Sequence, residues 1–282
     1  MPRPKIGLHV SGAGGLEEAP RRAYELGCEC FQFFSRSPRG GGAPKISHTT
    51  AQLFRERSAK WKLESYIHAP YYINFASKNN RVSFGSVSAI REELERGTLL
   101  GARYVMTHLG SASDLGENAA LKQTVDRLKE IYDPKKGGPH TTELLLEISA
   151  GTGAIIGDSF EELACILNGV ERPDLGICLD TCHLFASNYD LRTSAALSAT
   201  MRAFKKHIPI ERFKLVHAND SAFGFGERKD RHADIGDGHL GSETFRLLLR
   251  HRDFQGRNFV LETPGEEPRR KKDVALLKEL RR

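Results

Sequence analysis

The sequence predicts a single-domain α/β protein folded as a (β/α)8 barrel, in which eight parallel strands alternate with helices. Short apolar segments alternate eight times with segments of helical pattern along the 282 residues. This length is close to the roughly 250 residues usual for such a barrel. No linker or change of composition divides the chain, so we expect residues 1–282 to form one domain.

The eight expected strands are short and almost continuously apolar, as parallel strands are when helices cover both faces of the sheet. An open, doubly wound sheet would show the same alternation, but it more often has a phosphate-binding glycine loop after its first strand. The glycine-rich segment Ser11–Gly15 does not match that motif, which is GxGxxG with an acidic residue ~20 positions on. In order, the expected strands are Lys5–Val10, Cys30–Phe34, Ser65–His68, Tyr104–His108, Leu144–Ile148, Gly176–Leu179, Phe213–Val216 and Asn258–Leu261.

Helical periodicity and capping signals predict a helix after each strand. In the first helix, Ala19, Ala23 and Leu26 fall on one stripe, and Gly27 follows at the position of a C-terminal cap. Ser159 and the glutamate three residues later have the spacing of a capping box. In order, the expected helices are Leu16–Leu26, Thr50–Leu63, Val87–Leu100, Asn118–Ile131, Ser159–Leu167, Ser194–His207, Ser242–Leu249 and Asp273–Leu280.

The composition indicates a globular protein with a sizeable core. Hydrophobic residues make up 39% of the chain and charged residues 28%, which excludes global disorder. No apolar run approaches the ~18 residues of a membrane-spanning helix, and the first residues lack the apolar region of a signal peptide. Five cysteines without a CxxC pair argue against a disulfide framework, so we expect a cytoplasmic protein. The net charge of +6 is only weak evidence for an anionic partner.

A polar side chain stands at the carboxyl end of every expected strand. In a barrel these ends converge on one mouth, where catalytic groups lie. A single histidine there would more often be a hydrogen-bonded core residue. Six ionisable groups at the ends of the third to eighth strands are harder to explain in that way, because burial of unpaired charge is unfavourable. The strand-end residues are His9, Gln32, His68, His108, Glu147, Asp180, His217 and Glu262.

Two further pairs of residues extend this cluster. His183 follows Asp180 by three residues, and Asp230 and His232 lie in the loop after the seventh expected strand. The resulting five histidines and four carboxylates are too many for one tetrahedral zinc ion, which takes about four ligands, and would suit two or three metal ions. Such donors favour Zn²⁺ or Mn²⁺, and the many histidines favour zinc. Cys182 lies beside these groups and could be a thiolate ligand, but a free cysteine more commonly acts as a small packing residue.

Other charged and polar residues predict no site of their own. The basic run Arg269–Lys272 precedes the last expected helix, and we interpret it as a solvated face in preference to a DNA-binding patch. Four histidines lie away from the strand ends and are expected at the surface, namely His48, His140, His207 and His251.

Several segments of the chain resemble the endonuclease IV family, in the same order and over nearly the whole sequence, from Ile6 to Thr263. The DTCH segment and the DRHxxIGxG segment, which begins at Asp230, are together highly specific for that family. The resembling segments are His68-Ala-Pro-Tyr-Tyr-Ile-Asn74, Thr107-His108-Leu-Gly-Ser111, Leu146-Glu147-Ile-Ser-Ala-Gly151, Asp180-Thr-Cys-His183, His217-Ala-Asn-Asp220-Ser and Asp230-Arg-His232-Ala-Asp-Ile-Gly236.

The resemblance implies a zinc-dependent apurinic/apyrimidinic endonuclease of base excision repair on a TIM barrel. Such enzymes cut the phosphodiester 5′ to an abasic site in duplex DNA through a zinc-activated hydroxide. They leave a 3′-hydroxyl and also clean blocked 3′ ends by phosphodiesterase and phosphatase activity. By matching positions, Glu147 and Glu262 are the expected catalytic carboxylates, which act by holding metal. Three zinc ions per chain would be held by His68, His108 and Glu147; by Glu147, Asp180, His217 and Glu262; and by His183, Asp230 and His232.

The resemblance also implies how the protein would grip DNA. An abasic nucleotide lacks normal stacking, so it is rotated out of the duplex more easily than a normal one. Arg39 and Tyr71 match the family's positions for side chains that enter the duplex, although each would otherwise be read as an ordinary surface or loop residue. The chain departs from the family at Gly40–Gly42, Thr152 and Ala222, which we expect to weaken the grip on DNA. We expect a monomer, because DNA must lie across the barrel mouth, and no membrane partner.

Two other functions are consistent with parts of the pattern. A metal-dependent sugar or ketoacid isomerase of the same barrel superfamily could use Glu147, Asp180, His217 and Glu262, but it would leave the other five ligand-type residues without a shared purpose. A catalytically silent binder of damaged DNA would not need intact ligands at all nine positions.

Overall fold

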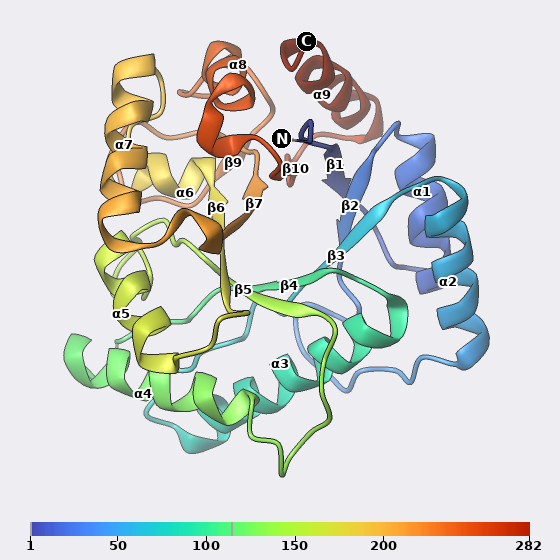
Figure 1. The fold of residues 1–282 in the computed structure, drawn as a ribbon, viewed down its shortest axis with the longest axis vertical. Coiled ribbons are helices and arrows are strands. Elements are labelled where there is room, and N and C mark those ends of the chain that lie inside the picture. Colours follow the sequence, from blue (N-terminus) through green and yellow to red (C-terminus); the bar gives the residue numbers. More distant parts are fainter. Residues whose placement is uncertain (1, 114) are drawn as a thin grey trace.

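The computed structural model describes residues 2–113 and 115–282, and within them eight parallel strands close into a barrel surrounded by helices (Figure 1). Neighbouring strands follow the order β1-β10-β7-β6-β5-β4-β3-β2 around the barrel. The fold class expected from the sequence is therefore confirmed. The barrel strands are β1 (Ile6–His9), β2 (Cys30–Phe33), β3 (Glu64–His68), β4 (Tyr104–Thr107), β5 (Glu143–Glu147), β6 (Gly176–Asp180), β7 (Phe213–His217) and β10 (Asn258–Leu261).

All eight expected strands are present, and their bounds differ from the expected ones by at most one residue at either end. Buried side chains continue along each strand because one face lines the barrel interior and the other packs under the helices. Gly7 shows how closely two strands approach. A Cβ at this position would lie 1.7 Å from the carbonyl oxygen of Cys30 on β2, so no larger residue fits there.

Helices cover the outside of the barrel, as Figure 1 shows. The helices are α1 (Ala19–Glu25), α2 (His48–Lys60), α3 (Asn80–Leu100), α4 (Glu117–Ile131), α5 (Phe160–Val170), α6 (Thr181–Ala186), α7 (Ser194–His207), α8 (Ser242–Arg250) and α9 (Glu267–Leu280). Short 3₁₀ turns occur at Leu16–Glu18, Ile210–Arg212 and Arg252–Phe254. No helix of the described residues is long and apolar enough to cross a membrane.

Two helices begin at least six residues earlier than expected, because their first turns carry no apolar stripe. Helix α3 begins at Asn80, where the side chain of Asn79 accepts a hydrogen bond from the Arg81 amide. Helix α9 begins at Glu267, with a proline in its first turn, so the basic run Arg269–Lys272 lies within the helix and not before it.

Two small elements at the barrel mouth were not expected. Helix α6 directly follows β6, and the side chain of Asp180 caps it by accepting from the His183 amide at 2.9 Å. Two short antiparallel strands, β8 (Asp220–Ser221) and β9 (His232–Ala233), pair within the loop after β7. Both elements orient candidate site residues.

Candidate metal centre

A cavity of about 920 Å³ opens at the carboxyl end of the barrel strands. Its walls come from the ends of several strands and from the long loop after β7. Side chains from both halves of the chain therefore meet there, including His68, His108, His183, Asp230, His232 and Glu262.

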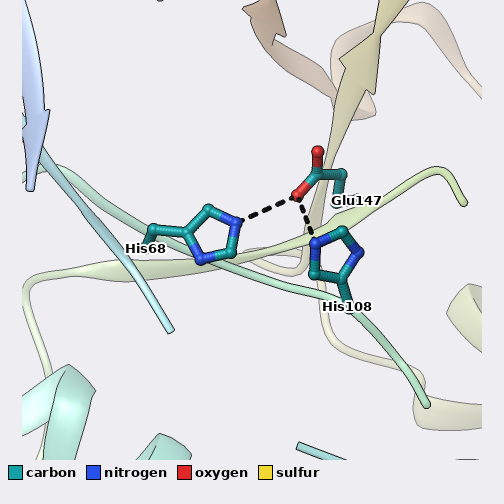
Figure 2. A group of neighbouring side chains, drawn as sticks. All are labelled: His68, His108 and Glu147. Carbon is teal, nitrogen blue, oxygen red and sulfur yellow. Dashed lines mark ion pairs between the residues drawn. The ribbon is translucent and has the colours of Figure 1, made fainter. Parts of the chain in front are cut away.

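The first group of ligand-type residues is His68, His108 and Glu147, whose side chains turn toward one another in Figure 2. The Nε2 atoms of the two histidines lie 3.5 and 3.7 Å from Oε2 of Glu147. These separations exceed the roughly 3 Å of an N–H···O hydrogen bond. They are close to the distance of about 3.3 Å between two ligands of one tetrahedral zinc ion. Oε2 of Glu147 is buried and has no hydrogen-bond partner among the described residues.

The second group contains Glu147, Asp180, His217 and Glu262, which come from β5, β6, β7 and the end of β10. His217 Nδ1 lies 2.7 Å from Glu147 Oε1 and 3.4 Å from Glu262 Oε2. On its other side, His217 Nε2 donates to Oε1 of Gln32 at 2.8 Å, which turns Nδ1 toward the carboxylates and makes it the nitrogen available to a metal ion. Glu147 belongs to both the first and the second group.

The third group is His183, Asp230 and His232. Oδ1 of Asp230 lies 3.2 Å from His183 Nε2 and 3.6 Å from His232 Nε2. Both nitrogens are buried without a hydrogen-bond partner among the described residues. His183 Nδ1 donates to the carbonyl of Ile148 at 2.8 Å, so the Nε2 atom is the one free to bind a ligand.

The pKa values at the centre reflect pairing between buried histidines and buried carboxylates. Burial disfavours the ionised form of Glu262, yet His217 and His68 outweigh it and lower the pKa of Glu262 to about 2. Burial also disfavours the ionised form of Glu147, but neighbouring histidines again outweigh it and lower the pKa of Glu147 well below its usual value. For His183 the carboxylates outweigh burial and raise the pKa well above 6.5. Glu147 and Glu262 are therefore ionised and can bind a metal ion without first losing a proton.

The residues present fit metal ions in several respects. Glu147, His183 and His232 each carry a buried polar atom without a partner among the described residues, and the donors are imidazole and carboxylate groups, which are ligands of zinc and similar ions. All nine residues expected from the sequence are brought together at one mouth, and the three groups have the membership that the resemblance implied.

Two hydrogen-bonding residues support the centre. Gln32, at the end of β2, also donates to Glu262 Oε1 at 2.6 Å and to His9 Nδ1 at 3.0 Å. Asn219, which the sequence analysis did not single out, donates to Asp180 Oδ2 at 2.6 Å. Its place in the resembling segment after His217 was the signal that could have found it.

The loop that carries Asp230 is tied to the loop after β5. The Thr152 hydroxyl donates to the carbonyl of Arg228 at 2.9 Å, and Arg228 Nε donates to the carbonyl of Gly151 at 2.7 Å. Arg228 has a φ of 55°, in the left-handed region, so this contact holds a strained turn two residues before Asp230. Thr152, a departure from the family pattern, therefore supports the third group indirectly.

Arg39 and Tyr71 lie in neighbouring loops at the mouth. The Tyr71 amide donates to the carbonyl of Pro38 at 3.1 Å, which joins the two loops. The Tyr71 side chain is 61% exposed, and its ring lies edge-on against Phe34 and His68. Arg39 is also exposed, and Gly40 after it has a φ of +123°.

The remaining candidates lie outside the three groups. Cys182 is buried, its pKa is raised to about 12 by burial, and its thiol faces the carbonyl of Arg231, so the packing role is favoured although it lies near Asp180 and His232. The basic run differs from its expected role, because Arg270 is half-buried and lines the cavity. The four histidines expected at the surface, His48, His140, His207 and His251, lie outside the groups. Of these, His48 is exposed and the other three are half-buried.

Fold and site together define a (β/α)8 barrel with a candidate centre for several metal ions at its mouth. A family model described as xylose isomerase-like TIM barrel matches residues 20–280. A probable endonuclease 4 of Halothermothrix orenii is 35% identical over 99% of each chain. The crystal structure of endonuclease IV from Thermus thermophilus matches with a TM-score of 0.87 and 31% identity, over 98% of each chain. The protein belongs to the endonuclease IV family of xylose isomerase-like TIM barrels, which supports a hydrolase of the nuclease class.

Sugar-modifying enzymes share the fold at much lower sequence identity. A D-tagatose 3-epimerase-like protein matches with a TM-score of 0.74 and 22% identity, over 98% of this chain and 96% of that one. At this identity the similarity concerns the fold alone, because one barrel supports many reactions.

Proposed function

We propose that the protein is a zinc-dependent endonuclease that hydrolyses the phosphodiester 5′ to abasic sites in duplex DNA and leaves a 3′-hydroxyl. The proposal includes removal of blocking groups from 3′ ends. The observation that carries it is the convergence of three ligand groups, two of which share Glu147, in one open cavity. Family membership supports a nuclease, and a phosphodiester is the anionic substrate that suits a centre once it holds metal cations.

In this proposal three zinc ions occupy the centre, one in each group. His68 and His108 would hold the first ion with Glu147, and the same carboxylate would bridge to the second. When bound, zinc supplies positive charge to phosphate oxygens and lowers the pKa of water toward ~7. The chain itself contributes orientation, since Gln32 and the carbonyl of Ile148 fix which nitrogen of His217 and of His183 faces the ions.

Arg39 and Tyr71 are proposed to contact the DNA around the abasic site. Both are exposed on adjoining loops at the mouth, where a duplex would lie. An arginine can bind phosphate, and a tyrosine ring can stack on a base. A single chain carries all of these groups, which supports action as a monomer.

The test is incision of a duplex that contains one tetrahydrofuran abasic analogue, before and after removal of metal by a chelator and its return. We expect incision 5′ to the analogue that disappears on chelation and returns with zinc. Incision that survives removal of metal contradicts the proposal. Turnover of a sugar or ketoacid without incision would instead support the isomerase, which needs only the second group.

Elemental analysis tests the number of ions. The unmodified protein should contain about three zinc ions per chain, and His183→Ala should lose roughly one of them, because a zinc ion is seldom retained after loss of a ligand. His48→Ala, at the exposed start of α2, is the matched control and should keep the full content. A content near one ion in the unmodified protein contradicts the trinuclear centre.

A further inference from the structure

Arg270 is a cation in the metal cavity that neither the three ligand groups nor the DNA-contacting loops include. It lies in the first turns of α9, which packs beside β1 (Figure 1). Its side chain lines the same cavity as His68 and Glu262, at the side formed by β1 and by the segment after β10. Arg270 therefore belongs to the wall of the cavity in which the proposed ions would lie.

The guanidinium of Arg270 is only partly engaged by the protein. Nη2 donates to the carbonyl of His9, which tethers the side chain to the end of β1. Nε is buried and has no hydrogen-bond partner among the described residues. No carboxylate of the described residues forms an ion pair with Arg270, whereas the adjacent Arg269 pairs with Asp273 at 3.0 Å.

A second unpartnered donor lines the same side of the cavity. Thr263, directly after Glu262, is 5% exposed, and its hydroxyl oxygen has no hydrogen-bond partner among the described residues. A buried hydroxyl and a buried guanidinium Nε without hydrogen-bond partners are both unfavourable unless a ligand completes them. Both groups donate hydrogen bonds, so the ligand that fits is an acceptor, and the guanidinium favours an anion.

We propose that Arg270, with Thr263, forms a phosphate-binding subsite of the metal cavity that receives a backbone phosphate of the DNA. This inference rests on the proposed function, and it identifies Arg270 as a side chain that binds the DNA substrate. Arg270 is a binding residue here, because it lines the cavity with a guanidinium that no carboxylate of the described residues pairs, while its tether to His9 keeps the side chain in place. Nearby Glu262 does not oppose the anion once its charge is balanced by metal.

The first experiment compares Arg270→Gln with Lys272→Gln in the zinc-loaded protein. Lys272 lies two residues further along α9 and is exposed, so the control removes the same charge away from the cavity. For Arg270→Gln we expect KM for the tetrahydrofuran duplex to rise roughly tenfold, the scale of a hydrogen bond to a charged group. The kcat should change little, because the contact holds substrate and transition state alike.

Salt dependence separates a phosphate contact from a structural tie between α9 and β1. Loss of one phosphate contact should make the plot of log affinity against log salt shallower by about one for Arg270→Gln. Arg270→Lys should restore much of the affinity and the slope, because it keeps the charge. A salt slope equal to that of the unmodified protein, an equal effect of Lys272→Gln, or loss of zinc from Arg270→Gln would overturn the inference.

Neutral phosphate replacements identify the phosphate that is bound. One phosphate at a time on the damaged strand is changed to a methylphosphonate, and binding is measured for the unmodified protein and for Arg270→Gln. At one position, the scissile phosphate or a neighbour, the replacement should weaken binding of the unmodified protein but not of the variant. Equal losses in both proteins at every position contradict the subsite.

The outcomes also separate this inference from the proposed function. If the unmodified protein binds and incises the duplex while Arg270→Gln does so equally well, the subsite is wrong and the proposed function stands. If the unmodified protein neither binds nor incises abasic duplexes, both are wrong. Thr263→Val should weaken binding less than Arg270→Gln, because a neutral hydrogen bond is weaker than a charged one.

Discussion

The two ends of the barrel differ in how their polar side chains are satisfied. At the amino-terminal end, Tyr66 donates to Glu64 at 2.6 Å, and Asn258 donates to both of them. Asn258 in turn accepts from the amide of Lys5, and Arg103 donates to Glu64 at 3.1 Å. This end is closed by hydrogen bonds within the chain.

At the carboxyl end hydrogen bonds within the described part of the chain leave several ligand-type atoms without a partner. Oε2 of Glu147 and the Nε2 atoms of His183 and His232 are buried and have no hydrogen-bond partner among the described residues. Buried polar groups are normally paired, and exceptions need an explanation such as an absent ion. The difference supports the proposal that the carboxyl end holds a ligand, whereas the amino-terminal end contributes to stability, the division of roles usual in barrels of this type.

The strongest test of this contrast is Glu147→Gln, because this carboxylate belongs to two of the ligand groups. Loss of an outer partner of a metal ligand already costs about 10–100-fold, so we expect incision to fall by more than about 100-fold. Zinc content and the stabilisation that zinc adds to the protein should fall as well. Steady-state incision, elemental analysis and thermal unfolding with and without chelator measure these effects. Full zinc content with normal incision would show that Glu147 holds no metal.

A smaller effect is expected for Gln32→Leu. The amide oxygen of Gln32 accepts from His217 Nε2 and so presents Nδ1 to the centre. Its loss should weaken zinc binding by about 10–100-fold, measured by competition with a chelator. Gln255→Leu, whose amide donates to the carbonyl of Leu249 in the outer layer, is the control and should leave zinc affinity unchanged. Equal zinc affinities in the two variants would show that Gln32 does not orient His217.

The centre should also make the stability of the metal-free protein depend on pH. Burial opposes protonation of His183 and His217, but surrounding carboxylates outweigh it and raise both pKa values well above 6.5. Groups with a raised pKa stabilise the fold fully below their unfolded pKa, and this stabilisation is lost as pH rises through the folded values. The Tm of the zinc-free protein should therefore fall as pH rises above 6.5. The Tm of the zinc-loaded protein should not show this fall. An equal fall in both forms would contradict the prediction that these histidines cause it.

A substitution at the amino-terminal end of the barrel should lower the stability of the protein without reducing its activity. Tyr66→Phe removes the hydroxyl that joins Glu64 to Asn258. We expect a loss of about 1 kcal/mol in the free energy of unfolding. For a protein of this size that corresponds to a fall in Tm of roughly 2–4 °C. Zinc content and incision should stay unchanged, and Tyr24→Phe, on the exposed face of α1, controls for the general effect of losing a tyrosine hydroxyl.

Much of the fold could be predicted because its signals are local. Each strand is a short apolar run, and each run is recognisable without knowledge of its neighbours. The starts of α3 and α9 could not be placed, because their exposed first turns carry no apolar pattern. The pairing of Asp220–Ser221 with His232–Ala233 depends on a contact across a long loop, which the residues of neither strand reveal.

The sequence alone determined that nine ligand-type residues would meet, because the carboxyl ends of parallel strands gather at one mouth. Which atoms face one another was decided only by the tertiary structure. Glu147 is shared by two groups through the packing of β3 to β7, and Arg270 reaches the cavity only because α9 returns beside β1. Such contacts join residues far apart in the chain, so their geometry follows from the closed barrel and not from any local pattern of residues.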